Sequence, residues 1–122
     1  MFQNDIKNKF YLVILDFLEH YCELGSNHAI ILYSGLSPEK DGKSIDKAMD
    51  SDLSAEIEKH IHHNKLTLED SIKTITSYLE KYYTQFNFHD LLPIINELKS
   101  PKESKATLLW KEIFKKYFYE IK

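Results

Sequence analysis

Residues 10–18 read Phe-Tyr-Leu-Val-Ile-Leu-Asp-Phe-Leu, and eight of these nine residues are apolar or aromatic. The run is too short to cross a bilayer, which needs about 20 residues, so we expect it to be buried inside the protein. A central strand and a buried helix are both compatible with it, and the flanking polar residues favour the helix. Those residues fall within about 60° of one another at helical spacing. They are Asp5, Lys9, Asp16, His20 and Glu23.

We therefore predict a first helix of about 20 residues, capped by Asn4 or Asp5 and ended by Gly25. The next apolar segment, residues 28–34, has candidate caps at Ser26 and Asn27, and we predict a short helix closed by Gly35. Residues 36–44 contain a proline and an Asp-Gly pair, which predict an exposed loop.

Apolar residues then recur at every fourth position between residues 45 and 61. One straight helix would rotate such a stripe by about 40° at each step, so we predict two shorter helices broken near residues 50–52. Ser51 or Asp52 would cap the second of them, and Asn64 would end it. The stripe consists of Ile45, Met49, Leu53, Ile57 and Ile61.

The remaining part of the chain carries three further helix signals. Thr67 begins a capping-box pattern, and the apolar residues after it alternate in steps of four and three up to residue 86. Residues 91–98 predict a short helix with Asp90 as its cap and Pro93 in its first turn. Ser100 is predicted to cap a terminal helix of about 20 residues. The first stripe consists of Leu68, Ile72, Ile75, Leu79, Tyr82 and Phe86.

These elements predict an all-α fold. We expect a compact single-domain bundle of about six to seven helices over residues 1–122, with long N- and C-terminal helices and shorter ones between them. With Cys22 as its single cysteine, the chain cannot form an intramolecular disulfide, which fits a reducing compartment. The first residues lack the pattern of a signal peptide, so we expect a cytoplasmic protein that does not enter a membrane.

The composition also restricts the classes of function. The chain has 16 lysines and no arginine, the residue that usually binds phosphates and guanine edges. A phosphate-ester enzyme or a direct nucleic-acid reader is therefore disfavoured, although an AT-rich genome would give the same bias. Charge is uneven: residues 1–61 carry eleven acids against six lysines (−5), and residues 62–122 carry eight against ten (+2).

No group of residues predicts catalysis. Residues 41–44, Asp-Gly-Lys-Ser, are similar to the end of a phosphate-binding loop, but Ser37 stands where that loop needs glycine. Asp16, His20 and Glu23 share a helix edge, with no nucleophile beside them. We therefore predict no enzyme, no catalytic residue and no cofactor.

A histidine cluster leaves one alternative open. Glu56, His60 and His63 would share a helix face near His62, and this set of side chains could bind zinc or nickel. Histidines at the end of a helix also interact favourably with its dipole, and we assign no metal on this pattern. A small helical metal-binding protein is kept as an alternative.

The most distinctive feature is an acidic segment. Residues 39–58 carry seven acids against three lysines, and we predict that they form a docking surface for a basic partner, the alternative being a solvated face. Two tyrosines lie off the apolar stripe of residues 68–86 and are predicted to be exposed beside it. The predicted partner-binding residues are Asp41, Asp46, Asp50, Asp52, Glu56, Glu58, Tyr78 and Tyr83.

An acidic segment on a small, lysine-only, all-helical chain resembles the bacterial toxin-immunity proteins, which are paired with colicins or contact-dependent growth-inhibition toxins. The resemblance covers the general character of the whole chain and not a motif. It implies a cytoplasmic, non-enzymatic protein that binds and neutralises the toxin domain of a neighbouring cell's effector, often a basic nuclease. A secretion chaperone or regulatory adaptor is the other protein-binding alternative.

Overall fold

The computed structural model describes residues 3–38, 46–100 and 102–119. These residues form six α-helices, one short 3₁₀ helix and no strand, so the all-α prediction is confirmed. The elements in chain order are α1 (Gln3–Glu23), α2 (Asn27–Leu36), α3 (Lys47–His60), α4 (Leu68–Phe86), η1 (His89–Leu91), α5 (Leu92–Lys99) and α6 (Lys105–Phe118). None of the helices in these residues is both long and apolar enough to span a membrane.

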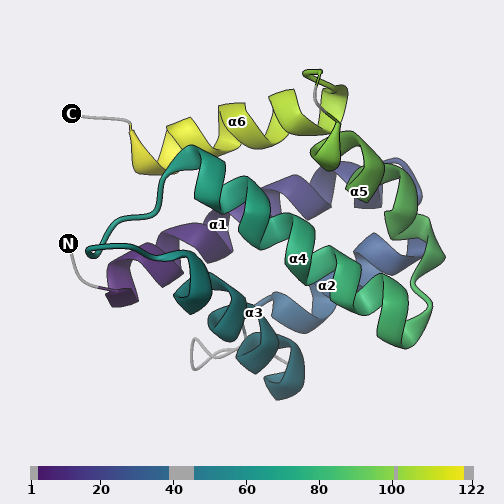
Figure 1. Ribbon diagram of the computed structural model, residues 1–122. Coiled ribbons are helices and arrows are strands. Elements are labelled where there is room, and N and C mark those ends of the chain that lie inside the picture. Colours follow the sequence, from purple (N-terminus) through teal and green to yellow (C-terminus); the bar gives the residue numbers. More distant parts are fainter. Residues whose placement is uncertain (1–2, 39–45, 101, 120–122) are drawn as a thin grey trace.

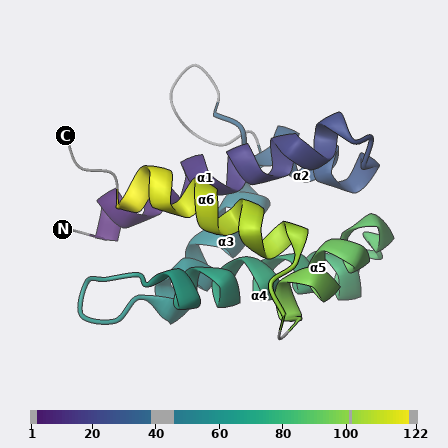
Figure 2. The same cartoon turned by 90° about the horizontal axis from the view of Figure 1, so that it is seen from above.

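The helices pack in two groups on opposite sides of one core (Figures 1 and 2). The first group is α1 with α2 and α6 along its sides, and the second is α4 with α3 and α5 along its sides. Helices α1 and α6 are antiparallel, since Lys9 near the start of α1 lies over the ring of Phe118 at the end of α6.

The apolar run of residues 10–18 forms the middle of α1, as predicted. Its inward side chains are fully buried, and two of its rings contact the buried Trp110 of α6. Ring burial of this kind contributes strongly to the stability of a core. The fully buried residues of α1 are Ile6, Phe10, Val13, Ile14, Phe17 and Leu18.

Several predicted helix ends are confirmed. Gly25 follows α1 with a φ of 91°, a left-handed conformation that glycine adopts without strain. The side chains of Ser26 and Thr67 accept hydrogen bonds from the amides of Ala29 and Asp70, which caps α2 and α4. Most of the predicted loop at residues 36–44 lies outside the described residues.

The prediction of two helices between residues 45 and 61 is wrong, because α3 is one continuous helix. It begins after Asp46, whose carboxylate accepts hydrogen bonds from the amides of Ala48 and Met49. The helix ends at His60, which leaves Ile61 beyond it. Within α3 the stripe therefore consists of Met49, Leu53 and Ile57. Two steps of four residues turn it by about 80° around the helix axis, which one buried face can accommodate.

The prediction that Gly35 closes the second helix is also wrong, because α2 continues through it to Leu36. Gly35 is buried where α2 crosses α3, and a Cβ at this position would collide with the sulfur of Met49. Glycine therefore permits close packing between the two helices at this position and does not end α2.

The terminal helix is shorter than predicted. Ser104, and not Ser100, caps α6 by accepting a hydrogen bond from the amide of Thr107. The carboxylate of Glu97 in α5 adds a second cap by accepting from the amide of Ala106. These contacts with α5 fix the start of α6, and sequence spacing alone does not reveal them.

Candidate functional site

Most of the described carboxylates of the predicted acidic segment make hydrogen bonds or ion pairs with other parts of the protein. Asp41 lies outside the described residues, and Asp46 is the cap of α3. Asp50 accepts a hydrogen bond from the hydroxyl of Tyr11 on α1, and Glu58 is exposed and paired with Lys7. These carboxylates join α3 to its neighbours or stabilise its first turn.

Asp52 is tied to α4 in the same way. Its two oxygens accept hydrogen bonds from Lys81 Nζ at 2.7 Å and from Tyr82 Oη at 2.8 Å. Burial raises the pKa of Asp52, but these two hydrogen bonds and the charge of Lys81 outweigh burial, so the pKa lies below its ordinary value. Asp52 is consequently ionised and held in place at neutral pH.

Glu56 is buried on the inner face of α3 and is paired with Lys59 of the same helix, 3.4 Å away. Among the described carboxylates of this segment, Glu58 is therefore the one that is exposed, and the docking surface predicted there stays a prediction. The exposed side chains of α3 include two lysines and a single carboxylate. They are Lys47, Ala48, Ser51, Ala55, Glu58 and Lys59.

Tyr78 is fully buried, so the prediction that it is exposed is wrong. Its hydroxyl donates to the carbonyl of Met49 on α3, 3.3 Å away. Phe86, predicted to be buried, is instead 55% exposed. The buried face of α4 is thus rotated away from the purely apolar stripe and includes the small polar residues Ser71 and Thr74. Tyr83 is half-buried against the core.

The histidines near the end of α3 do not converge. His60 Nδ1 lies 2.9 Å from the carbonyl of Glu56, one turn back on the same helix. His62 and Lys65 exchange backbone hydrogen bonds in a tight turn, and this turn places His63 and Asn64 at positive φ. Among the described residues, the three-residue group with metal-like spacing is a different one, His28, His89 and Asp90.

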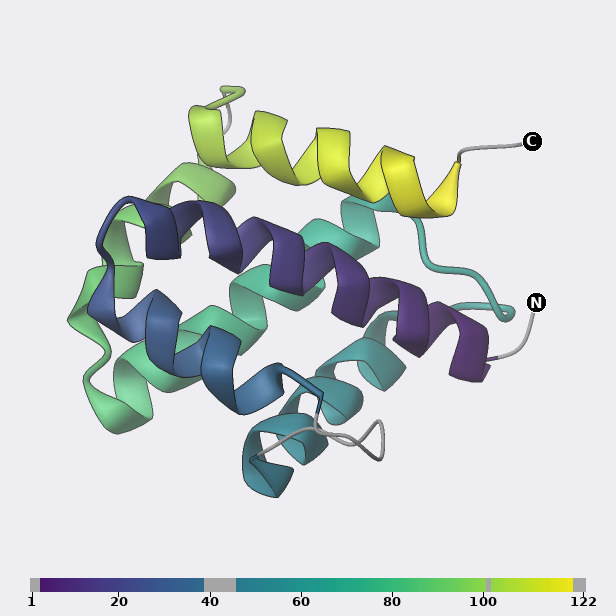
Figure 3. The same ribbon diagram turned by 180° about the vertical axis from the view of Figure 1, so that it is seen from behind.

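The strongest concentration of exposed acid lies on α1. Figure 3 shows α1 running across the front of this side of the molecule, between α6 and α2. Three of its exposed side chains are carboxylates and none is a lysine. The exposed side chains of α1 among residues 5–23 are Asp5, Asn8, Leu12, Glu19, His20 and Glu23. At 100° per residue, Asp5, Asn8, Leu12, Glu19 and Glu23 lie within about 60° of one another, and we call this face the α1 stripe.

Asp5, Glu19 and Glu23 make no ion pair with any residue that the structure describes. Asp16 lies in the same stripe and is held by a hydrogen bond of 2.6 Å from the hydroxyl of Tyr117 on α6. That hydrogen bond, together with burial, raises the pKa of Tyr117 to about 12. The stripe thus combines one fixed carboxylate with three that are open to solvent.

The charge of the α1 stripe also affects its neighbours. Burial and then the carboxylate of Glu19 raise the pKa of the Cys22 thiol and of the Tyr33 hydroxyl. A thiol with a raised pKa has less of the nucleophilic thiolate form at neutral pH.

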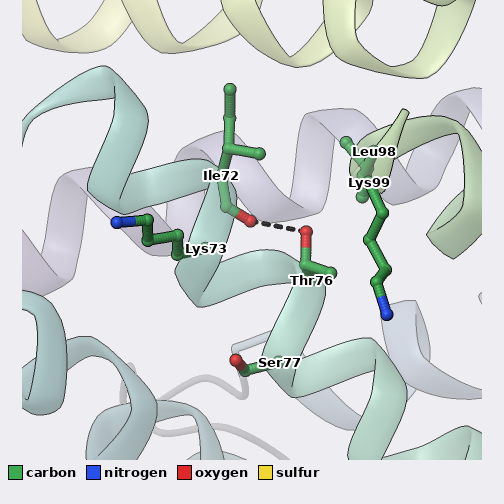
Figure 4. Close-up of a pocket in the computed structure, with 6 residues that line it drawn as sticks. All are labelled: Ile72, Lys73, Thr76, Ser77, Leu98 and Lys99. Carbon is green, nitrogen blue, oxygen red and sulfur yellow. Dashed lines mark hydrogen bonds between the residues drawn. The ribbon is translucent and has the colours of Figure 1, made fainter. Parts of the chain in front are cut away.

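An open depression of about 310 Å³ lies between α4 and α5 (Figure 4). Lys73 and Lys99 lie on its opposite sides, and the amine of Lys99 is paired with Glu80 at 2.9 Å. The hydroxyl of Thr76 donates to the carbonyl of Ile72 on its own helix. Small-molecule sites usually direct several polar groups at one point, and this depression does not.

The polar edge of α1 was visible in the sequence, but its position between α2 and α6 was not. The spacing of residues 5–23 shows which of them share a face, whereas only the packing shows that no helix of the described residues covers this face. Comparison with known proteins adds no further assignment: no family model, no curated protein and no solved structure matches the chain.

Proposed function

We propose that the chain is a non-enzymatic protein-binding module of the immunity-protein kind, which binds and neutralises a basic toxin domain through the α1 stripe. The observation that carries this proposal is the set of exposed, unpaired carboxylates on α1. Carboxylates at the rim of an interface raise the rate of association with a basic partner and disfavour acidic partners.

The stripe also has apolar surface, which an interface needs at its centre. Leu12 is 47% exposed on α1, and Ile30 is 42% exposed on the neighbouring α2. Apolar side chains surrounded by charged ones are the usual anatomy of a protein interface. Leu12 lies between Asp5 and Glu19 in the stripe, so it is our candidate for the apolar anchor.

The proposal rests on the carboxylates of α1 and not on those of α3, which the sequence had suggested. The carboxylates of α3 hold the fold together through Tyr11, Lys81 and Tyr82. A charge reversal at Asp50 or Asp52 would therefore damage the fold and report little about binding. On α1, Glu19 and Glu23 make no ion pair or hydrogen bond with a described residue, so their reversal tests binding alone.

Co-expression tests the proposal most simply. The chain is expressed in bacteria together with the product of each gene that neighbours its own, and cell survival is measured. We expect one neighbouring product to be toxic by itself and harmless with the wild-type chain, and we expect the Glu19→Lys/Glu23→Lys variant to lose most of this protection.

The matched control is Glu69→Lys/Glu112→Lys, which makes the same change in net charge with exposed carboxylates of α4 and α6. It should protect as well as the wild type. If no neighbouring product is toxic, the immunity function is contradicted. If both variants protect equally, the function stands and the α1 stripe is not its surface.

A further inference from the structure

The fold brings together two histidines and an aspartate that are far apart in the sequence. His28 lies in the first turn of α2, while His89 and Asp90 belong to η1, the short connection between α4 and α5. One ligand atom from each of the three side chains lies within 4.8 Å of the others. His28 and Asp90 are mostly buried and His89 is open to solvent, with exposed side-chain fractions of 17%, 30% and 70%.

Each histidine approaches a different oxygen of the same carboxylate. His28 Nδ1 lies 3.4 Å from Asp90 Oδ2, and His89 Nε2 lies 3.5 Å from Asp90 Oδ1. Both contacts are long for a hydrogen bond between a charged pair. In a tetrahedral zinc site with bonds of about 2.0–2.1 Å, neighbouring ligand atoms are about 3.3–3.4 Å apart. Each contact is close to the length of an edge of such a tetrahedron. Because the contacts end on different oxygens, binding through one oxygen of Asp90 requires a small shift of one histidine.

From this geometry we propose that His28, His89 and Asp90 form a binding site for a divalent transition-metal ion, with zinc as the ion that fits best. Two imidazoles and one carboxylate are a donor set that zinc accepts, and three protein ligands leave the fourth position open to water. The magnesium and calcium ions prefer all-oxygen sites, so they do not fit this donor set.

The surroundings hold His28 ready to bind a metal. Its ring is stacked on Phe88 with 4.6 Å between the centroids and 11° between the planes, and His89 meets it edge-on. The amide of Asp90 donates to His28 Nδ1 at 3.2 Å, and the tautomer that accepts this hydrogen bond has the lone pair that a metal needs on the same nitrogen. A metal ion would take this lone pair from the amide, which gives up one long hydrogen bond.

Asp90 is fixed as well. Its Oδ2 accepts a hydrogen bond from the backbone amide of His28, at 3.3 Å. Two of the three ligands are therefore positioned by reciprocal contacts between α2 and η1. His89 is exposed, and a rotation of its side chain brings its nitrogen to the distance that the ion requires.

The site is separate from the α1 stripe and independent of the proposed function. It links residues that are 62 positions apart, on α2 and on the connection between α4 and α5. A metal ion bound only by the folded protein stabilises it by mass action. Zinc should therefore raise the midpoint of thermal unfolding.

Calorimetric titration with zinc chloride tests the site, on full-length protein without a histidine tag. We expect one equivalent of zinc to bind with a Kd at or below about 10 μM, and His89→Ala or Asp90→Asn to weaken binding more than about tenfold. His89→Ala changes an exposed side chain, so we expect this variant to fold. Cobalt in place of zinc should give the visible absorption of a tetrahedral site, and the absorption should be lost in the same variants.

The control is the triple variant His60→Ala/His62→Ala/His63→Ala, which removes the histidine cluster at the end of α3. It should bind zinc as the wild type does. The proposal is overturned if the wild type binds zinc only in the millimolar range. It is equally overturned if His89→Ala leaves the Kd unchanged, or if the triple variant is the one that loses binding.

Discussion

Trp110 lies where α1, α4 and α6 meet. Its ring centroid lies 5.4 Å from that of Phe10 and 5.2 Å from that of Phe17, both on α1. Its N–H donates to the hydroxyl of Ser71 on α4 at 2.9 Å, and that hydroxyl donates to the carbonyl of Leu68 at 2.6 Å. One buried serine thus completes the contact between α6 and α4.

We expect Ser71→Ala to destabilise the protein. The substitution leaves the buried indole N–H without an acceptor, which costs about 1–3 kcal/mol of unfolding free energy. Urea unfolding followed by circular dichroism measures this loss.

Ser77→Ala is the matched control for that loss, since Ser77 is a half-buried serine on the same helix whose hydroxyl makes no hydrogen bond with a described residue. Both variants gain the helix propensity of alanine, so their difference reports the hydrogen bonds of the Ser71 hydroxyl, to the Trp110 indole and to the Leu68 carbonyl. An equal unfolding free energy for the two variants would show that the contact contributes nothing.

At this scale the sequence identifies the large buried residues better than their polar partners. Trp110 and the residues of α1 are apolar at helical spacing, which predicts burial directly. Ser71 and Tyr78 were not assigned to the core, because a hydroxyl can be buried only where the fold supplies a partner, and the partners of these two residues are on other helices.

At the scale of elements, the close crossing of α2 and α3 depends on the absence of a side chain at Gly35. A Cβ at Gly35 would meet the sulfur of Met49 and lie 3.3 Å from Asp46 Cβ. Gly35→Ala in the wild type is therefore expected to cost about 1–3 kcal/mol through overpacking.

The same substitution in a Met49→Ala background should cost much less, because the main collision is absent. A double-mutant cycle measured by chemical denaturation should give a coupling free energy of at least about 1 kcal/mol. A cost that is the same in both backgrounds would show that Met49 does not set the need for glycine.

Each described α-helix lies where the sequence predicts helix, although α3 was predicted as two helices and several ends were predicted wrongly. Thr67 and Gly25 act through local contacts, and local signals predicted both ends correctly. The start of α6 depends on Glu97 of α5, and the passage of α2 through Gly35 depends on α3. Ends that are set by another helix cannot be found from the sequence near them.

On the scale of the whole molecule, the net charge of −5 over residues 1–61 does not predict where the accessible charge lies. Asp50 and Asp52 of α3 accept hydrogen bonds from α1 and α4, while Asp5, Glu19 and Glu23 of α1 are exposed. Helix α1 itself runs between α2 and α6 (Figure 3). A sequence shows the sign and spacing of charge, and tertiary packing decides which part of it a partner meets. The sequence therefore predicted a partner-binding surface on α3, whereas the accessible carboxylates favour one on α1.

The same redistribution applies to the histidines. The cluster at residues 60–63 is adjacent in sequence but does not converge, and the converging group joins α2 to η1. Ligands separated by 61 and 62 positions have no spacing pattern that a motif could describe. Only the packing of α2 against the connection between α4 and α5 reveals them.

The central claim is that the α1 stripe binds a basic partner, and the most direct measurement is the association rate constant with the toxic neighbouring product. We expect Glu19→Lys/Glu23→Lys to lower this rate constant by about tenfold or more at low salt, with a smaller difference at physiological ionic strength, because screening weakens exposed charges. Glu69→Lys/Glu112→Lys should leave it within about twofold of the wild type, as expected of charges outside the interface. An association rate that responds equally to both variants, or to neither, would contradict the claim.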